Sequence, residues 1–538
     1  MSQSHLVLFD ADHIKDYVFT TGRLKEIRGA SEMVRQLTDE TQLCASAVFA
    51  AYGLTPWESP GPARIIYAAG GAGAILFADG ARAQAFCQDL EGNYQRQTRS
   101  ATLSAVTVSI EGIGPVAELD AQRQGARALA RRKASKPQIR ALPGGGLLRF
   151  GDSDRLHPAE VQLLDPDDQL LVLSEETARK RKLSFDFRRA MADSPFWEGF
   201  RQALPERQRE NWQGLPRESQ DLNTIGTKSH PSGYVAFIHL DGDSVGSALR
   251  EVVRKGGFAA YHRFSQALDT AAQTATAQAL ATAYQNHVPS RHRPRQSQAE
   301  LSIELPFELI TIGGDDVMLV CTAEHGLGVA RMISAQFGPL VHSYLDAHEV
   351  RLEHPLSASV GVVIAHASMP IVQLQERARE LLKNAKHQRD PKRDVGIGFF
   401  DFQIVTTPAL DQIKLLRQQG YQGNDGAEFT RRPYRCDHAE TLLRQAQILR
   451  HMPDFSGSKR TDLYNACAES RMQATLDVLT VSLRLRAAER TVLLHALHEL
   501  DSVSYFPFTQ EYAGGQLRFR TALLDLLEVV EFTPGETQ

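Results

Sequence analysis

Two adjacent carboxylates follow two glycines in the middle of the chain, at Gly313-Gly314-Asp315-Asp316. The residues on both sides, within 307–320, are apolar and rich in β-branched side chains, which predicts a β-hairpin with this motif at its tip. Two glycines let a ligand approach the backbone closely. Neighbouring carboxylates repel each other unless a cation lies between them. The motif is also compatible with an ordinary surface turn, so its surroundings must decide.

A second acidic segment ends an upstream predicted strand. Residues 234–240 are apolar and lead directly into Asp241 and Asp243. If this strand lies beside the hairpin, carboxylates from both converge on one point, which is the oxygen-ligand arrangement that Mg²⁺ prefers. Such a site suits metal-assisted phosphoryl transfer, and we predict that Asp241, Asp315 and Asp316 are both the catalytic residues and the metal ligands.

Other residues near these carboxylates could bind the phosphates of a nucleotide. A helix is predicted to begin at Asp243 and Ser244, where backbone amides could cradle phosphate oxygens. Lys383 and Lys386 lie on a later predicted helix and could reach a triphosphate as point charges. Asp243 could instead cap the helix, and each lysine could belong to a solvated helix face.

Composition sets the limits of this interpretation. A chain of 538 residues predicts three or four domains, and a net charge of −4 argues against a protein that wraps nucleic acid by charge alone. The five cysteines form no CxxC pair, so neither a disulfide framework nor a zinc site is indicated. No signal peptide and no membrane-length apolar run is found. We therefore expect a soluble, cytoplasmic protein without membrane contact.

The chain contains a degenerate internal repeat. Both copies predict the order β-α-β-β-α-β, which is the split βαβ, ferredoxin-like unit. In the first copy, strands are predicted at 6–12, 64–68, 75–78 and 103–110, and the second helix at 81–97. In the second copy, strands are predicted at 237–243, on both sides of the hairpin turn and at 357–364, and the second helix at 325–348. In the first copy the turn reads Gly-Gly-Ala-Gly-Ala at 70–74. Because alanine cannot hold a metal, we expect this copy to be catalytically silent while still able to bind a nucleotide.

The predicted fold class is α+β, with two ferredoxin-like palm domains, a small connecting domain and a C-terminal helical domain. The boundaries that we predict are 1–150 for the first palm, 151–232 for the connecting domain, 233–402 for the second palm and 403–538 for the helical domain. Helix-like apolar spacing at 438–451, 475–498 and 517–530 supports the last assignment.

These motifs together resemble the large subunit of type III CRISPR effector complexes, which has two cyclase-like palm domains with Gly-Gly-Asp-Asp in the second. The likeness spans most of the chain. The segments that carry it are FDADHIKDYVF at 9–19, IRGAS at 27–31, HLDGDSVG at 239–246, GGDD at 313–316, SASVGV at 357–362, NAK at 384–386 and RRPY at 431–434.

The resemblance implies synthesis of cyclic oligoadenylate messengers from ATP when the complex binds target RNA. On that basis Asp315 and Asp316 bind Mg²⁺ or Mn²⁺ in the donor site, while Ser31 and Arg28 line the acceptor pocket. Asp10 would belong to the nucleotide site of the first palm. The implied partners are other type III effector subunits with their guide and target RNA.

Two departures from the family pattern change what we expect. The sequence contains no His-Asp dipeptide, so we expect the form without an HD nuclease and no metal-dependent DNase activity. The cysteine pairs that family members often carry between the palms are absent, so we expect no zinc. Packing around Trp197 and Trp212 would take its place.

Three alternatives remain open at this point. The chain could be an RNA-sensing scaffold subunit with little turnover, although a scaffold needs no paired carboxylates. It could be a signal synthase that joins AMP to an acceptor other than ATP. It could also be a homodimeric enzyme like a diguanylate cyclase, which the second palm in the same chain disfavours.

Overall fold

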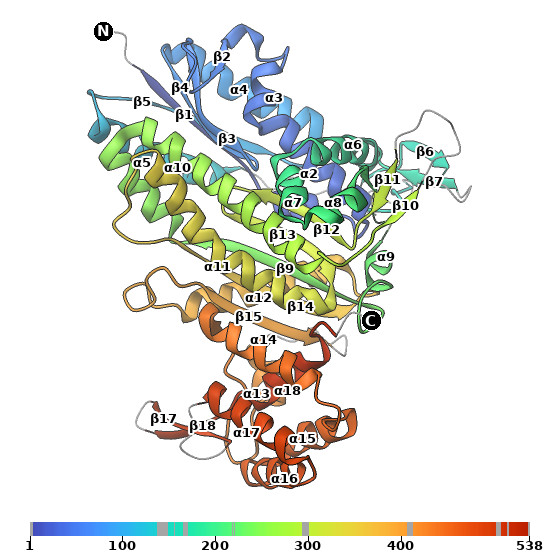
Figure 1. The fold of residues 1–538 in the computed structure, drawn as a ribbon. Coiled ribbons are helices and arrows are strands. Elements are labelled where there is room, and N and C mark those ends of the chain that lie inside the picture. The colour runs from blue at the N-terminus through green and yellow to red at the C-terminus, as the bar shows by residue number, and fades with distance from the viewer. Residues whose placement is uncertain are drawn as a thin grey trace.

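The structure is a computed structural model, and it places most of the chain (Figure 1). The described residues are 4–136, 149–154, 157–164, 170–217, 219, 221–292, 301–405, 413–501, 507–513 and 516–535. Two sheets with their helices form the upper and middle parts of Figure 1, and a group of helices lies at the opposite end. Mixed sheets and helices of this kind confirm the predicted α+β class.

The first sheet has five strands in the order β2-β3-β4-β1-β5. Its strands are β1 (His5–Ala11), β2 (Leu54–Pro56), β3 (Ala63–Ala69), β4 (Ala72–Phe77) and β5 (Leu103–Ser109). The central strand β1 carries an unbroken apolar run whose side chains are buried on both faces, as expected for a strand covered on both sides. The helices of this half are α1 (Ile14–Val18), α2 (Leu24–Thr38), α3 (Glu40–Ala45), α4 (Gly80–Thr98) and α5 (Pro115–Ser135).

The second sheet has six strands in the order β12-β13-β9-β14-β15-β16. They are β9 (Tyr234–Asp243), β12 (Phe307–Gly313), β13 (Asp316–Thr322), β14 (Ser357–His366), β15 (Phe399–Val405) and β16 (Tyr434–Arg435). The helices are α10 (Val245–Ala283), α11 (Ala323–Ala347) and α12 (Ile371–Gln388). Within each sheet the four repeated strands lie antiparallel in the same order, β3-β4-β1-β5 and β12-β13-β9-β14, so the predicted split βαβ repeat is confirmed.

The two palms share apolar core. Val235 and Phe237 of β9 belong to the same buried cluster as Ile27 on α2, and the rings of Phe19 and Phe237 lie 6.4 Å apart. A second contact joins α5 to α10, because the N–H of Phe258 donates to the Glu118 carboxylate at 2.5 Å. The halves are therefore packed together directly.

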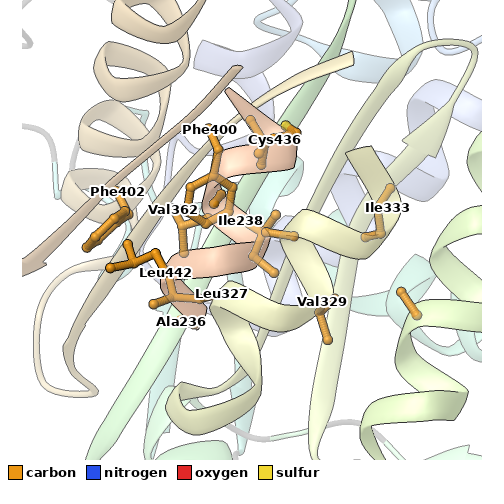
Figure 2. Close-up of a cluster of buried hydrophobic side chains, with 14 of the residues drawn as sticks. Ala236, Ile238, Leu327, Val329, Ile333, Val362, Phe400, Phe402, Cys436 and Leu442 are labelled. Carbon is orange, nitrogen blue, oxygen red and sulfur yellow. The ribbon is translucent and has the colours of Figure 1, made fainter. Parts of the chain in front are cut away.

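The other face of the second sheet packs on helices (Figure 2). Side chains of β9, β14 and β15 meet α11 and α14 (Cys436–Arg450) there. The labelled members of this cluster are Ala236, Ile238, Leu327, Val329, Ile333, Val362, Phe400, Phe402, Cys436 and Leu442. The C-terminal helices are thus anchored on the palm that carries the Gly-Gly-Asp-Asp hairpin.

The remaining elements flank the palms. Those between the palms are β6 (Val161–Leu164), β7 (Leu170–Leu173), α6 (Glu175–Ala192), α7 (Pro195–Ala203), α8 (Glu206–Arg209), β8 (Leu215–Arg217) and α9 (Leu222–Gly226). Strand β8 pairs with β11 (Ser302–Glu304), which also pairs with β10 (Ser290–His292). Those after β15 also include α13 (Ile413–Gly420), α15 (Gly457–Glu469), α16 (Arg471–Leu483), α17 (Ala487–Asp501), β17 (Thr509–Ala513), β18 (Gln516–Arg520) and α18 (Leu523–Glu531). The helix predicted over 517–530 is wrong in its first part, where β18 pairs with β17 before α18 begins.

Candidate active site

Strand pairing brings the predicted carboxylates to one edge of the second sheet. Asp316, at the start of β13, lies directly opposite Asp241 on β9, and Asp241 lies opposite Ser359 on β14. Asp315 occupies the turn beside them, and the Gly242 N–H donates to its carbonyl oxygen at 3.1 Å. The hairpin and the upstream strand are therefore neighbours, as the sequence argument required.

Two glycines make this close approach sterically feasible. Gly314 has φ +59°, a left-handed conformation that favours glycine at the hairpin turn. A Cβ atom on Gly242 would lie 2.9 Å from the Cβ of Asp315 and 2.6 Å from Cγ2 of Val245. Any larger residue at 242 would push the hairpin tip away from β9.

Asp315 lies in an unfavourable environment for a charge. Burial, and then the neighbouring Asp241 carboxylate, raise the pKa of Asp315 to about 7. A buried carboxyl group with a raised pKa beside a second carboxylate is a candidate functional group.

Asp316 has the opposite electrostatic environment. Burial alone would raise its pKa, but the His239 ring and then the Lys15 ammonium hold the pKa of Asp316 below its ordinary value. His239 Nε2 lies 3.0 Å from Asp316 Oδ1, and Lys15 Nζ lies 3.3 Å from Asp316 Oδ2. Lys15 belongs to the first palm, so residues from both palms surround this carboxylate.

The third carboxylate, Asp241, is paired with Lys386 from α12. The same ammonium donates to the Gly242 carbonyl oxygen at 2.8 Å. Lys386 thus lies in the site, where the sequence argument placed it.

The donor set suits a hard divalent cation, because three carboxylates meet at one sheet edge and one of them has a raised pKa. Within the described residues, however, no group of three or more His, Cys, Asp or Glu side chains is arranged to hold a metal ion as it stands. In this structure the ammonium groups of Lys386 and Lys15 contact oxygens of Asp241 and Asp316. A cation at these oxygens would have to compete with both lysines.

Asp243 lies apart from the other carboxylates. It is buried and accepts hydrogen bonds from Ser357 at 2.8 Å and Ser359 at 2.9 Å, with Arg389 Nε at 3.9 Å. It therefore fastens β9 to β14. The cap position of α10 belongs to Ser244, which has φ +60° and receives a 3.4 Å contact from Arg389.

Lys383 points toward another part of the molecule. It lines a cavity of about 1040 Å³ together with Arg417 of α13 and Arg518 of β18. This cavity lies between α12 and the C-terminal elements, so the structure places Lys383 apart from Lys386 and the carboxylates.

The first palm repeats this construction without the hairpin carboxylates. Lys133 Nζ donates to Asp10 at 2.5 Å, as Lys386 does to Asp241. Asp12 accepts from Thr102 and Ser104, as Asp243 accepts from two serines. Both palms therefore contain the same frame of carboxylates, hydroxyls and a lysine.

The pairing of β3 with β4 corrects the predicted equivalence of the two turns. Asp10 lies opposite Ala72, as Asp241 lies opposite Asp316. The counterpart of Gly-Gly-Asp-Asp is consequently Ala-Gly-Gly-Ala at 69–72, one residue earlier than the repeated glycines suggested. The positions of both hairpin carboxylates remain occupied by residues without ligand atoms.

The two hairpin tips face each other. A Cβ atom on Gly313 would lie 3.9 Å from the Cα of Gly70. Nearby, the rings of Tyr67 and Tyr261 lie 5.3 Å apart, and the charges of both Asp10 and Asp315 act on Tyr67. The carboxylates of the second palm are therefore directed toward the first palm.

The predicted acceptor residues on α2 have different surroundings. Arg28 is buried, lies 3.2 Å from Glu308 on β12 and donates to the Ser219 carbonyl oxygen, so it joins α2 to the second palm inside the protein. Ser31 Oγ is a buried atom without a hydrogen-bond partner among the described residues. The polar atoms of both predicted acceptor residues are therefore buried inside the protein.

Sequence reasoning overlooked Lys15, His239 and Asp269. Asp269 of α10 lies 3.4 Å from the Gly314 N–H, and burial raises its pKa. His239 alternates with Asp241 along the strand, which was the one signal in the sequence that could have indicated it. Lys15 comes from the other palm, and no spacing rule predicts that contact.

Comparison with known proteins agrees with this geometry. Residues 234–395 match the family described as Cas10/Cmr2, second palm domain, whereas no curated protein matches the sequence. Csm1 of T. onnurineus has a similar fold, with a TM-score of 0.57 and 14% identity over 99% of this chain and 70% of that one.

Two further similar structures are Csm1–Csm4 cassettes. One is in complex with cA4 (TM-score 0.52, 12% identity, 93% of this chain and 65% of that one), and the other with AMPPNP (TM-score 0.54, 12% identity, 99% and 70%). At such identities the likeness is one of fold. No helix of the described ranges has both the length and the apolar character that crossing a membrane demands. Residues 234–395 therefore match the second palm domain of the Cas10/Cmr2 family, and the chain is similar in fold to Csm1.

Proposed function

We propose that this protein is a nucleotidyltransferase that makes cyclic oligoadenylate from ATP, as a subunit of a type III CRISPR effector complex that senses target RNA. The observation that carries the proposal is the placement of Asp315 and Asp316 beside Asp241, on a hairpin whose tip faces the first palm. Similar folds have been solved as Csm1–Csm4 assemblies with cA4, AMPPNP or one ATP.

Asp241, Asp315 and Asp316 are the residues that would hold Mg²⁺ or Mn²⁺. When bound, a divalent cation supplies charge neutralisation at the triphosphate and lowers the pKa of the attacking hydroxyl. His239 holds one oxygen of Asp316 in a fixed orientation, and Gly242 leaves the space in which Asp315 lies against β9. These contacts hold the carboxylates at the hairpin tip that faces the first palm.

The first palm would present the acceptor. Its Asp10 and Lys133 form the same ion pair as Asp241 and Lys386, but Ala69 and Ala72 flank its turn. Such a palm can bind a nucleotide and cannot provide the hairpin ligands. The product depends on whether the acceptor is ATP or another adenosine-bearing molecule. The mass of the product distinguishes the two.

The test is to incubate the purified effector complex with labelled ATP, Mg²⁺ and cognate RNA. We expect pyrophosphate release. The mass of the product should be a whole-number multiple of the mass of one adenylate unit, which is AMP less one water molecule. The variant Asp315→Ala/Asp316→Ala should release no pyrophosphate. Equal release from this variant, or none from the wild type with its RNA bound, would refute the proposal. A product in which AMP is joined to another molecule would show that the acceptor is not ATP.

A further inference from the structure

The two palms are alike in their carboxylate frame but differ at positions that touch one another. Strand pairing makes Asp10 equivalent to Asp241, so Leu8 is the counterpart of His239 and Ala72 that of Asp316. The pair of His239 and Asp316 is thus particular to the second palm.

The third difference comes from the first palm. The residues that precede α1 and α10, His13 and Ser244, share a left-handed backbone, with φ of 52° and 60°. Two residues further on, the first palm has Lys15 and the second has Gly246. A long cationic side chain is therefore present in one palm only.

These three particular residues meet across the junction of the palms. Lys15 Nζ lies 2.9 Å from His239 Nε2 and 3.3 Å from Asp316 Oδ2, while His239 Nε2 lies 3.0 Å from Asp316 Oδ1. The His239 side chain is 1% exposed, whereas Asp316 is 28% and Lys15 36% exposed. The histidine is fixed in the interior, and the lysine reaches Asp316 from the solvent side.

A lysine in this place competes with a cation. The oxygen of Asp316 that Lys15 contacts is one that a bound cation would need, and like charges exclude each other at such a distance. Lysine carries its charge on a flexible four-carbon stem, so the ammonium can relocate without movement of α1. Mg²⁺ arrives at sites of this kind together with substrate phosphates, which offer the displaced ammonium a new partner.

We propose that Lys15 of the first palm exchanges places with the divalent cation. Without a cation it balances Asp316. When the cation binds, Lys15 leaves Asp316 and contacts the phosphates of the incoming nucleotide as a positioning residue. This inference rests on the proposed function, since that function supplies the cation and the triphosphate.

A purely structural role for Lys15 makes a different prediction. If Lys15 served only as an ion pair that joins the palms, its loss would loosen the site and leave cation affinity unchanged or weaker. Exchange requires the opposite, because removing the competitor leaves Asp316 free to take the cation.

The experiment measures Mn²⁺ binding to the full-length, nucleotide-free protein by electron paramagnetic resonance. Lys15→Gln should bind Mn²⁺ more tightly, by up to about thirtyfold, the effect of a unit charge on a divalent cation at roughly 4 Å in a water-like dielectric. Lys15→Arg keeps the charge and should match the wild type. Lys182→Gln, which removes an exposed lysine of α6, is the matched charge control and should also match.

The second arm measures AMPPNP binding at saturating Mn²⁺. Lys15→Gln should weaken it at least fivefold, so that one substitution changes the two affinities in opposite directions. Should Lys15→Gln fold poorly, Lys15→Met gives the same test with a stem of similar length. Unchanged or weaker Mn²⁺ binding, or undiminished AMPPNP binding, overturns the exchange. If the wild type turns over ATP at the same time, only this inference fails and the proposed function stands.

Discussion

At the scale of single residues, the site alternates charges of opposite sign. Asp241 and Asp316 each contact an ammonium group, from Lys386 and Lys15, while Asp315 lies beside Asp241 and has a raised pKa. The lysines balance the charges of Asp241 and Asp316, and the raised pKa favours the protonated form of Asp315. If a cation binds here as proposed, both lysines would move and Asp315 would lose a proton.

The raised pKa of Asp315 predicts the pH dependence of cation binding. Burial and the Asp241 carboxylate favour the protonated form below about pH 7, and a metal binds only the ionised form. Mn²⁺ affinity should accordingly rise about tenfold between pH 6 and pH 8, because the ionised fraction of a group of that pKa rises by about this factor. Calorimetry at the two pH values measures it. The rise should be absent in Asp315→Asn, and an equally steep rise in that variant would contradict the assignment.

The close contact between β9 and the hairpin tip makes Gly242 a sensitive position. In Gly242→Ala the new methyl group would lie 2.9 Å from the Asp315 Cβ, so the tip must move. We expect a loss of ATP turnover of at least tenfold with a destabilisation of about 1–3 kcal/mol, the usual cost of overpacking. Turnover assays and thermal melts measure the two effects, and full activity would show that the tip position is unimportant.

At the scale of elements, α10 shows how backbone geometry joins the palms. This helix bends at Gly257, which has φ 63° and ψ −154°, a region nearly closed to other residues. The bend exposes the N–H of Phe258, which donates to Glu118 on α5. The helix that follows β9, the strand paired with the Gly-Gly-Asp-Asp hairpin, is thereby tied to the first palm.

Gly257→Ala should destabilise the protein. The substituted residue would carry backbone strain of about 1–3 kcal/mol, and its Cβ would lie 2.3 Å from a Glu118 oxygen. The matched control is Gly328→Ala in α11, where no atom lies within 4 Å and the backbone is helical. There alanine should be neutral or stabilise by up to about 1 kcal/mol. Thermal melts compare the variants, and equal melting temperatures would contradict the argument.

Elements with a strong periodic signal could be predicted from the sequence. The palm strands and α4 and α11 lie close to their expected ranges, because alternation and amphipathic spacing are local properties. The start of the 517–530 segment was misassigned, since the partner strand β17 and not the local pattern decides its structure. The turn of the first palm was shifted by one residue because the register depends on β1.

The site was predictable only as far as it is contiguous in sequence. Asp241, Asp315 and Lys386 come together as a strand end, a hairpin tip and a following helix of one repeat. Lys15 approaches from the other repeat, and Arg28 is withdrawn into an ion pair with Glu308. Contacts between repeats depend on how the two sheets pack, which no single-segment pattern encodes.

At the scale of the whole molecule, one buried arginine links the second palm to the C-terminal helices. Arg432 donates to the Phe402 carbonyl oxygen on β15 and lies 2.8 Å from Asp525 and 3.2 Å from Glu528 on α18. Its guanidinium also stacks on the Phe402 and Tyr421 rings. The C-terminal region is thus held to the palm by charge as well as by the apolar cluster of Figure 2.

Arg432→Met should loosen this junction. It leaves two buried carboxylates without their cation, a change that typically costs about 3–5 kcal/mol. Arg484→Met, at an exposed position in the turn between α16 and α17, is the control and should change stability little. Hydrogen exchange of α18 and thermal melts measure the effect. Equal stability of the two variants would show that the apolar contacts suffice.

The two palms share one design, but only the second has hairpin carboxylates, and its hairpin tip faces the first palm. The most direct measurement is the anomalous scattering of Mn²⁺ in crystals of the protein grown with AMPPNP. We expect a manganese peak about 2.0–2.6 Å from carboxylate oxygens of Asp315, Asp316 or Asp241, with the triphosphate beside it. A fully bound nucleotide with no manganese at these oxygens would contradict it.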